Sequence, residues 1–114
     1  MTTVDAAWCC DHPLPRLRPG LDKEARGTVL VIGGSALVPG ATLLTGEAAL
    51  RVGAGKVQIG TVASAATAIG VAFPESAVIA LPAGGDGEIS AAANAAIDDH
   101  ALDCSVLVIG PGTS

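Results

Sequence analysis

The same five residues, Val-Leu-Val-Ile-Gly, occupy positions 29–33 of this sequence and recur at positions 106–110. Each copy continues into further turn residues, Gly34 after the first and Pro111-Gly112 after the second. Apolar side chains occupy both alternating faces of each copy, which is typical of a strand covered on both sides in a parallel sheet. The repeat therefore predicts two interior strands, each ending in a glycine turn.

The segments outside these two copies alternate between helix-forming and strand-forming composition. Pro39 stands where the first turn of a helix could begin, and Asp86, in a glycine-rich turn, could cap a later helix. With right-handed crossovers, this order predicts an α/β fold with a parallel or mixed sheet covered by helices. The expected elements are strands at 28–32, 56–61, 76–81 and 105–109, and helices at about 40–53, 63–72 and between residues 86 and 99.

Residues 1–20 differ in composition from the rest of the chain. Pro13, Pro15 and Pro19 each remove a backbone donor and disfavour helix in the residue before them, and Gly20 closes the segment. We therefore expect an N-terminal arm outside the core. The chain has 114 residues, of which 50% are hydrophobic, and this size suits one domain or part of one.

The charge distribution limits the ligands that this chain can bind through side chains. The net charge is −5, and the six Lys and Arg residues form no basic stripe, which excludes a general polyanion binder. Lys56 is the last basic residue. Any phosphate bound by the second half of the chain must therefore be held by backbone N–H groups.

Neither cysteine usage nor hydropathy points to secretion or a membrane. The cysteines are an adjacent pair, Cys9 and Cys10, and a single Cys104, which form no disulfide framework. The first ten residues lack the charged and apolar regions of a signal peptide, and no apolar run approaches the ~18 residues of a membrane span. We expect a cytoplasmic protein in a reducing compartment.

The repeated strand-plus-glycine unit is the strongest indication of a binding site. Two such strands side by side would place both glycine turns at the carboxyl edge of the sheet, where open α/β sheets bind ligands. Glycine allows a ligand close to the backbone, whose N–H groups can serve as donors. The helix that starts near Gly40 would point its N-terminus into the same crevice. The alternative is that these glycines only make tight turns.

Three common motifs fail on inspection. In Gly53-Ala54-Gly55-Lys56, the next residue is valine where a phosphate loop needs Ser or Thr. Gly33-Gly34 lacks the spacing of a dinucleotide-binding fingerprint. Cys9, Cys10 and His12 lack a second pair of ligands for zinc.

Several motifs taken together resemble the ADP/ATP-dependent NAD(P)H-hydrate dehydratases. The resemblance covers about residues 22–112 and implies a ribokinase-like α/β fold. It makes residues 21–114 the N-terminal half of such a domain, with a truncated sheet, after an arm at 1–20. The motifs that carry it are Arg26–Ser35 (RGTVLVIGGS), Pro39-Gly40-Ala41, Ala48–Val57 (AALRVGAGKV), Phe73-Pro74-Glu75 and Ile109–Gly112 (IGPG).

The resemblance also implies a function. Members of the family repair NADH or NADPH that is hydrated on the nicotinamide ring, using ADP or ATP with Mg²⁺: the hydroxyl is phosphorylated, phosphate leaves, and the reduced cofactor is restored. The hydrated NADH or NADPH would be the partner of this chain, and we expect a homo-oligomer that binds neither nucleic acid nor membrane. Carried over by position, the residues of the substrate pocket are Gly34, Ser35, Gly40, Ala41, Gly110 and Gly112.

The catalytic half of the family domain is not matched. The resemblance places a Pro-His motif, the main nucleotide-binding residues and a Gly-x-Gly-Asp motif with the catalytic base later in the family domain, and none of these motifs occurs here. We assign no catalytic or metal-binding residue and expect the isolated chain to be inactive. The alternatives are another ribokinase-like small-molecule kinase, or a non-catalytic fragment that binds a nucleotide through its glycine loops.

The acidic residues of the second half give no obvious base. We expect the 84–88 turn and the end of the last helix to lie away from the carboxyl edge. Glu75 is the one acid whose loop could approach that edge.

Overall fold

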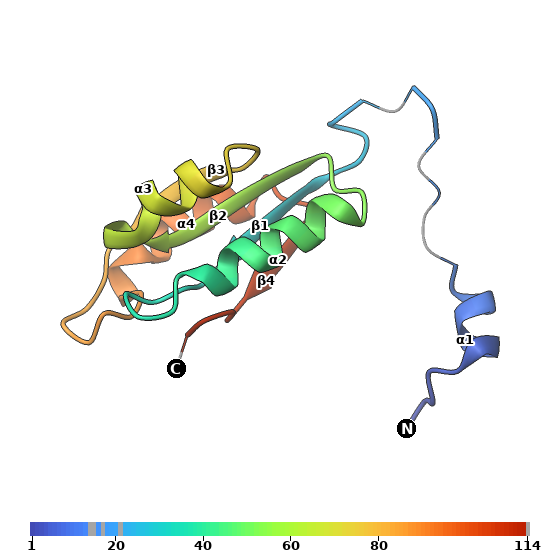
Figure 1. Cartoon of the computed structure of the whole chain (residues 1–114), viewed down its shortest axis with the longest axis horizontal. Coiled ribbons are helices and arrows are strands. Elements are labelled where there is room, and N and C mark those ends of the chain that lie inside the picture. The colour runs from blue at the N-terminus through green and yellow to red at the C-terminus, as the bar shows by residue number, and fades with distance from the viewer. Residues whose placement is uncertain (14–15, 17, 21, 114) are drawn as a thin grey trace.

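The computed structural model describes residues 1–13, 16, 18–20 and 22–113. A four-stranded sheet forms the centre, and all of its strand pairs are parallel. The expected α/β architecture is therefore confirmed (Figure 1). In chain order the elements are α1 (Ala6–Asp11), β1 (Thr28–Ile32), α2 (Gly40–Arg51), β2 (Lys56–Val62), α3 (Ala63–Ala72), β3 (Ala77–Leu81), the 3₁₀ turn η1 (Ala91–Ala93), α4 (Asn94–Ala101) and β4 (Val106–Ile109).

The two copies of the repeat are neighbours in the sheet, whose strand order is β3-β2-β1-β4. Val29 pairs with Val106 and Ile32 with Ile109, so the copies lie in register from end to end. The first copy is an interior strand, as predicted, but the second copy, β4, lies at an edge of the sheet and is largely exposed, so the prediction of two interior strands is wrong for it. Their side-by-side arrangement brings both glycine turns to the carboxyl edge of the sheet.

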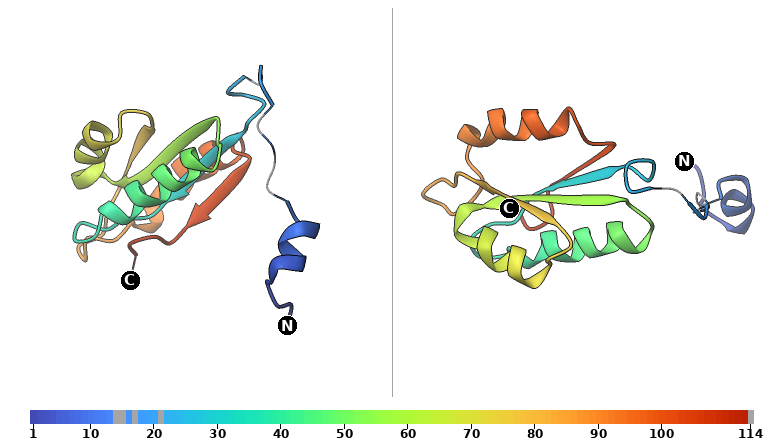
Figure 2. Two further views of the ribbon diagram at one scale, coloured as in Figure 1. Left: turned by 45° about the vertical axis from the view of Figure 1, so that its right-hand side comes forward. Right: turned by 90° about the horizontal axis from the view of Figure 1, so that it is seen from above.

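Helices cover both faces of the sheet, as Figure 2 shows: α2 and α3 lie on one face and α4 on the other. There are therefore two separate cores, and alternating residues of β1 enter both. Under α2 and α3 the buried residues are Val31, Val57, Ile59, Ile69 and Phe73. Under α4 they are Leu30, Ile32, Leu81 and Ala93.

Two details of the predicted elements are wrong. The side chain of Asp86 accepts a hydrogen bond from the N–H of Glu88 at 3.1 Å, which closes a turn, and α4 begins only at Asn94 after η1. Asp86 therefore caps no helix. Within η1, Ala92 is exposed and Ala93 is fully buried.

The N-terminal arm contains α1, a short helix that the sequence analysis did not predict in this proline-containing segment. Asp5 caps it by accepting a hydrogen bond from the N–H of Trp8 at 2.9 Å, and the Trp8 ring stacks on His12 with centroids 4.2 Å apart. Figure 1 shows α1 apart from the sheet, which agrees with an arm outside the core. Within the described part of the chain, no helix is both long and apolar enough to cross a membrane.

Two helical glycines make a matched pair for testing how closely α2 packs on the sheet. A Cβ on Gly46 of α2 would lie 2.9 Å from Phe73 Cε1 and 3.1 Å from Ile59 Cδ1, whereas a Cβ on Gly70 of α3 meets only Val78 Cγ2 at 3.7 Å. We expect Gly46→Ala to destabilise the fold by about 1–3 kcal/mol through overpacking. Gly70→Ala should stabilise it by about 0.5–1 kcal/mol through helix propensity. Urea unfolding followed by circular dichroism measures both, and equal effects of the two changes would contradict close packing of α2.

Candidate functional site

The two glycine turns pack directly on each other. The N–H of Gly34 donates to the carbonyl of Pro111 at 2.7 Å, and the N–H of Gly110 donates to the carbonyl of Ile32 at 3.0 Å. A Cβ on Gly112 would meet the carbonyl oxygen of Val38 and would lie 3.4 Å from Gly34 Cα. The glycines therefore let the two loops approach each other, in addition to any role toward a ligand.

This contact corrects one expectation from the sequence. The glycine turns were expected to offer unoccupied N–H donors, but those of Gly33, Gly34 and Gly110 already donate to backbone carbonyls. Donors suitable for a ligand remain at the start of α2. Its first N–H groups have no acceptor within the helix, and Pro39 has no N–H, so Gly40 and Ala41 present theirs outward.

The structure brings the six predicted pocket residues to one edge of the sheet. Gly34 and Ser35 follow β1, Gly40 and Ala41 begin α2, and Gly110 and Gly112 follow β4. Ala41 Cβ lies 3.0 Å from the position that a Cβ on Gly112 would take, so α2 and the second loop are in contact. Gly34 and Ser35 are buried, Gly40 is exposed, and the other three are half-buried. The surface open to a ligand is therefore formed by the start of α2 and the loop after β4.

Buried hydroxyl groups stabilise this edge from beneath. Among the described residues, the buried polar side chains are those of Ser35, Thr42 and Thr61, and all three lie around the start of α2. Ser35 Oγ accepts a hydrogen bond from the N–H of Val38 at 3.1 Å, and Thr42 Oγ1 donates to the carbonyl of Pro39 at 2.8 Å. The approach to α2 is thus fixed by side chains on both sides of Pro39.

Thr61, on the neighbouring strand, packs against Gly34. Its hydroxyl is fully buried and has no hydrogen-bond partner among the residues that the structure describes. It lies 2.6 Å from the position of a Cβ on Gly34, whose φ is +75°. The sequence analysis did not identify Thr42 or Thr61. Thr61 could have been identified, because it stands next to the last residue of β2, at the same edge of the sheet.

Two acidic loops each lie at the edge of the sheet opposite to the one expected from the sequence. The turn that holds Asp86 follows the carboxyl end of β3, and the carbonyl of Gly87 accepts a hydrogen bond from the N–H of Ala36 at 2.9 Å. It therefore lies beside the first glycine loop. Glu75 comes just before β3 and shares a hollow with Leu50 and Arg51 at the far end of α2, so it lies at the amino edge, away from the candidate site.

The residues at this edge do not fit a magnesium-bound nucleotide. In the described ranges, no group of three or more His, Cys, Asp or Glu side chains could hold a metal ion. Lys and Arg are absent from the sequence of every segment that forms the edge, namely 33–42, 60–62, 82–90 and 109–113. Apart from Asp86 and Glu88 and the exposed side chains of Leu37 and Val38, the edge offers backbone donors and small side chains, which suit an uncharged polar group.

Comparison with known proteins shows the family of this chain. The family model described as NAD(P)H-hydrate dehydratase matches residues 29–114, which is most of the sequence. The chain belongs to that family, and the resemblance stated from its motifs is confirmed.

Two curated relatives carry related names. The ADP-dependent (S)-NAD(P)H-hydrate dehydratase of Xanthomonas campestris is 52% identical over 110 residues, which are 96% of this chain and 37% of that protein. The bifunctional NAD(P)H-hydrate repair enzyme of Thermanaerovibrio acidaminovorans is 40% identical over 95 residues, 82% of this chain and 19% of that protein. The chain thus spans well under half of the length of either relative.

Solved structures agree with the fold. A ribokinase-like superfamily protein from Enterococcus faecalis superposes with a TM-score of 0.71 over 89% of this chain and 32% of its own, at 22% identity. The ADP/ATP-dependent NAD(P)H-hydrate dehydratase of Bacillus subtilis, co-crystallized with ATP/Mg²⁺, gives a TM-score of 0.54 at 37% identity and covers 59% of this chain and 24% of its own. The first likeness supports the ribokinase-like fold, and the second joins that fold to the family.

Proposed function

We propose that this chain supplies part of the substrate pocket of an ADP- or ATP-dependent NAD(P)H-hydrate dehydratase. The observation that carries the proposal is the meeting of Gly34, Ala41 and Gly112 at the carboxyl edge of β1 and β4. In the proposed reaction, hydrated NADH or NADPH loses water at the expense of the nucleotide. The names of the family model and of both curated relatives support this substrate.

The chemistry of the edge indicates which part of the substrate binds there. The N–H groups of Gly40 and Ala41 can donate to an acceptor oxygen, and no cationic side chain stands in the segments around them. A pyrophosphate would lack charge partners here, whereas the carboxamide and hydroxyl of a hydrated nicotinamide need only hydrogen bonds. We therefore assign this edge to the hydrated ring and place the nucleotide and Mg²⁺ on residues that this chain does not contain.

A chimeric enzyme tests the proposal. This chain replaces the matching 110-residue segment of the X. campestris relative. The chimera should restore NADH absorbance at 340 nm from hydrated NADH when ADP or ATP and Mg²⁺ are supplied. Nucleotide consumption with some other hydroxyl compound, without NADH formation, would instead indicate a small-molecule kinase. A folded but inactive chimera would contradict both.

Substitutions at the start of α2 should weaken substrate binding in this chimera. A Cβ on Gly40 has no neighbour within 4 Å, so Gly40→Val should leave the fold intact while filling the space in front of the helix donors. We expect Gly40→Val and Ala41→Asp each to raise the KM for hydrated NADH at least fivefold. Leu44→Ala, an exposed position on the same helix, is the matched control. An unchanged KM in both variants would place the substrate elsewhere.

The cytoplasmic location and homo-oligomeric state expected from the sequence are parts of the same proposal. The exposed apolar side chains of β4 give a physical reason for self-association of the chain alone. Light scattering after size-exclusion chromatography tests this, and a monodisperse monomer would contradict it.

A further inference from the structure

One buried hydroxyl group is left unpaired at the candidate site. The hydroxyl of Thr61 is fully buried and has no partner in the described part of the chain, whereas those of Ser35 and Thr42 both form hydrogen bonds. An unpaired buried hydroxyl lowers the stability of a fold, and valine has nearly the same shape without that penalty. A threonine at this position therefore needs a reason other than stability.

The position of this hydroxyl relates it to the start of α2. A Cβ on Gly34 would lie 2.6 Å from Thr61 Oγ1 and 3.3 Å from both Pro39 Cα and Thr42 Cγ2. These three atoms surround one point between the first glycine loop (residues 33–38) and the first turn of the helix. The hydroxyl is thus directed into the crevice beneath the helix start, whose first N–H groups have no acceptor within the helix.

A ligand at the start of α2 cannot touch Thr61 directly, because Thr61 is fully buried. Gly34 contacts both Thr61 and the second glycine loop, since a Cβ on Gly112 would lie 3.4 Å from Gly34 Cα. Any effect of Thr61 on a ligand is therefore transmitted through Gly34 and its peptide groups. Glycine has no Cβ, so these peptide groups can turn at little steric cost.

We propose that Thr61 is a positioning residue for the hydrated nicotinamide ring. When the ring occupies the start of α2, a peptide carbonyl of the first glycine loop turns toward Thr61 and accepts a hydrogen bond from its hydroxyl. Because this bond forms only in the bound state, it favours binding of the ring without contacting it. This inference rests on the proposed function and adds the residue through which substrate binding orders the site.

Variants of the X. campestris chimera test this role. The dissociation constant of hydrated NADH, measured by equilibrium dialysis without nucleotide, should rise at least fivefold in Thr61→Val. The KM should rise by a similar factor, while kcat changes less than twofold. Thr61→Ser retains the hydroxyl and should keep both constants within twofold of the wild-type values.

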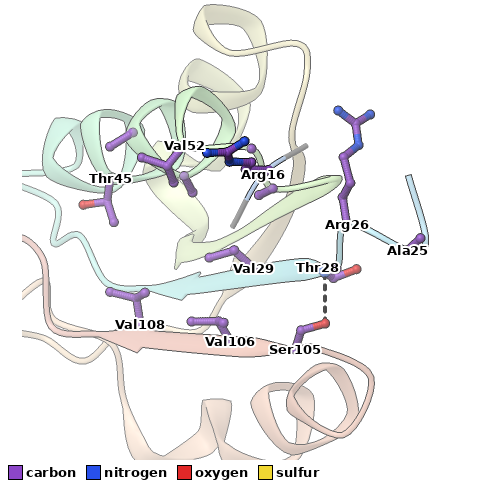
Figure 3. A pocket seen from close by; sticks show the side chains of 15 residues that line it. Arg16, Ala25, Arg26, Thr28, Val29, Thr45, Val52, Ser105, Val106 and Val108 are labelled. Carbon is purple, nitrogen blue, oxygen red and sulfur yellow. Dashed lines mark hydrogen bonds between the residues drawn. The ribbon is translucent and has the colours of Figure 1, made fainter. Parts of the chain in front are cut away.

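A second strand threonine provides the matched control. Thr28 begins β1 at the amino edge, where it lines a groove between α2, β1 and β4 (Figure 3). Its N–H donates to Ser105 Oγ at 3.2 Å, and a valine at position 28 keeps that backbone donor. Thr28→Val should therefore change neither the dissociation constant nor the KM.

Urea unfolding of the chain separates this role from a structural one. Thr61→Val should leave the urea midpoint unchanged or raise it, because no hydrogen bond is lost. Thr42→Val, at an equally buried position whose hydroxyl is paired, should lower the midpoint. A midpoint that falls as far in Thr61→Val as in Thr42→Val would show that the Thr61 hydroxyl is already paired in the free protein, and would overturn the proposal.

The outcomes distinguish this inference from the proposed function. An active chimera in which Thr61→Val keeps the wild-type dissociation constant and KM rejects the positioning role and leaves the function standing. Equal weakening in Thr61→Val and Thr61→Ser also rejects it, because the hydroxyl is then not the cause. A chimera that binds hydrated NADH less tightly only in Thr61→Val, but forms no NADH, supports the positioning role and rejects the function. A wild-type chimera that does not bind hydrated NADH overturns both.

Discussion

Gly34→Ala should destabilise this fold strongly, because the new methyl group has no free space and the backbone there is left-handed. The new Cβ would lie 2.6 Å from Thr61 Oγ1 and 3.3 Å from Pro39 Cα, and the φ of +75° disfavours any side chain. Left-handed backbone costs about 1–2 kcal/mol and overpacking a further 1–3 kcal/mol. The sum, about 2–5 kcal/mol, is a large fraction of the total stability of a small domain.

Two other glycines separate backbone strain from steric clash. Gly110 has a φ of +114°, but a Cβ there would have its nearest neighbour, Thr113 Oγ1, at 4.0 Å. Gly85 has neither a positive φ nor a neighbour within 4 Å. Gly110→Ala should therefore cost about 1–2 kcal/mol from strain alone, and Gly85→Ala less than about 0.5 kcal/mol.

The measurement must follow the sheet itself. The single tryptophan, Trp8, lies on α1 outside both cores, so its fluorescence would not report unfolding of the sheet. Urea unfolding followed by far-UV circular dichroism is suitable. Equal stabilities of the Gly34→Ala and Gly85→Ala variants would show that Gly34 is not packed against Thr61 and Pro39 as described.

The two strands of the repeat could be predicted from the sequence because the same apolar pattern occurs twice. Apolar residues on both faces of 29–32 and 106–109 indicate buried parallel strands, which is correct for β1, whereas β4 lies at an exposed edge. The bounds of the other strands were correct to within one residue. The existence of a strand depends on a local pattern that the sequence displays directly.

Both acidic loops were expected at the wrong edge of the sheet, although the predicted order of strands and helices is sufficient to place them correctly. In a parallel sheet, a loop that follows a strand lies at the carboxyl edge and a loop that precedes one lies at the amino edge. This rule alone puts Asp86, after β3, beside the candidate site, and Glu75, before β3, at the far edge.

Contacts between residues distant in sequence could not be predicted in the same way. The contact of Gly34 with Thr61 depends on the register of β1 and β2, and that of Gly46 with Phe73 depends on how α2 lies on the sheet. No local pattern in the sequence states either. The N-cap of α1 could be predicted in principle, because it is a local contact. Asp5 stands three residues before Trp8 and accepts a hydrogen bond from its N–H. The prolines that follow Asp5 led us to expect no helix in this segment.

The chain by itself should not convert hydrated NADH to NADH when ATP or ADP and Mg²⁺ are supplied. Phosphorylation of a hydroxyl needs a base within about 2.6–3.2 Å of its proton. It also needs positive charge where negative charge develops on the transferred phosphoryl group. The segments of the carboxyl edge contain no Lys or Arg, and the described residues contain no group that could hold a metal ion.

The position of the acidic loops decides which variant tests this expectation. Glu75 lies at the amino edge and cannot reach a substrate bound at the start of α2. Asp86 lies at the carboxyl edge, but its Oδ1 already accepts the N–H of Glu88, and it is exposed to solvent. We therefore expect no NADH formation above the protein-free control, with or without Asp86→Asn. Turnover by the wild-type chain that Asp86→Asn abolishes and Glu75→Gln leaves unchanged would show that the turn after β3 supplies a base and that this edge suffices for catalysis.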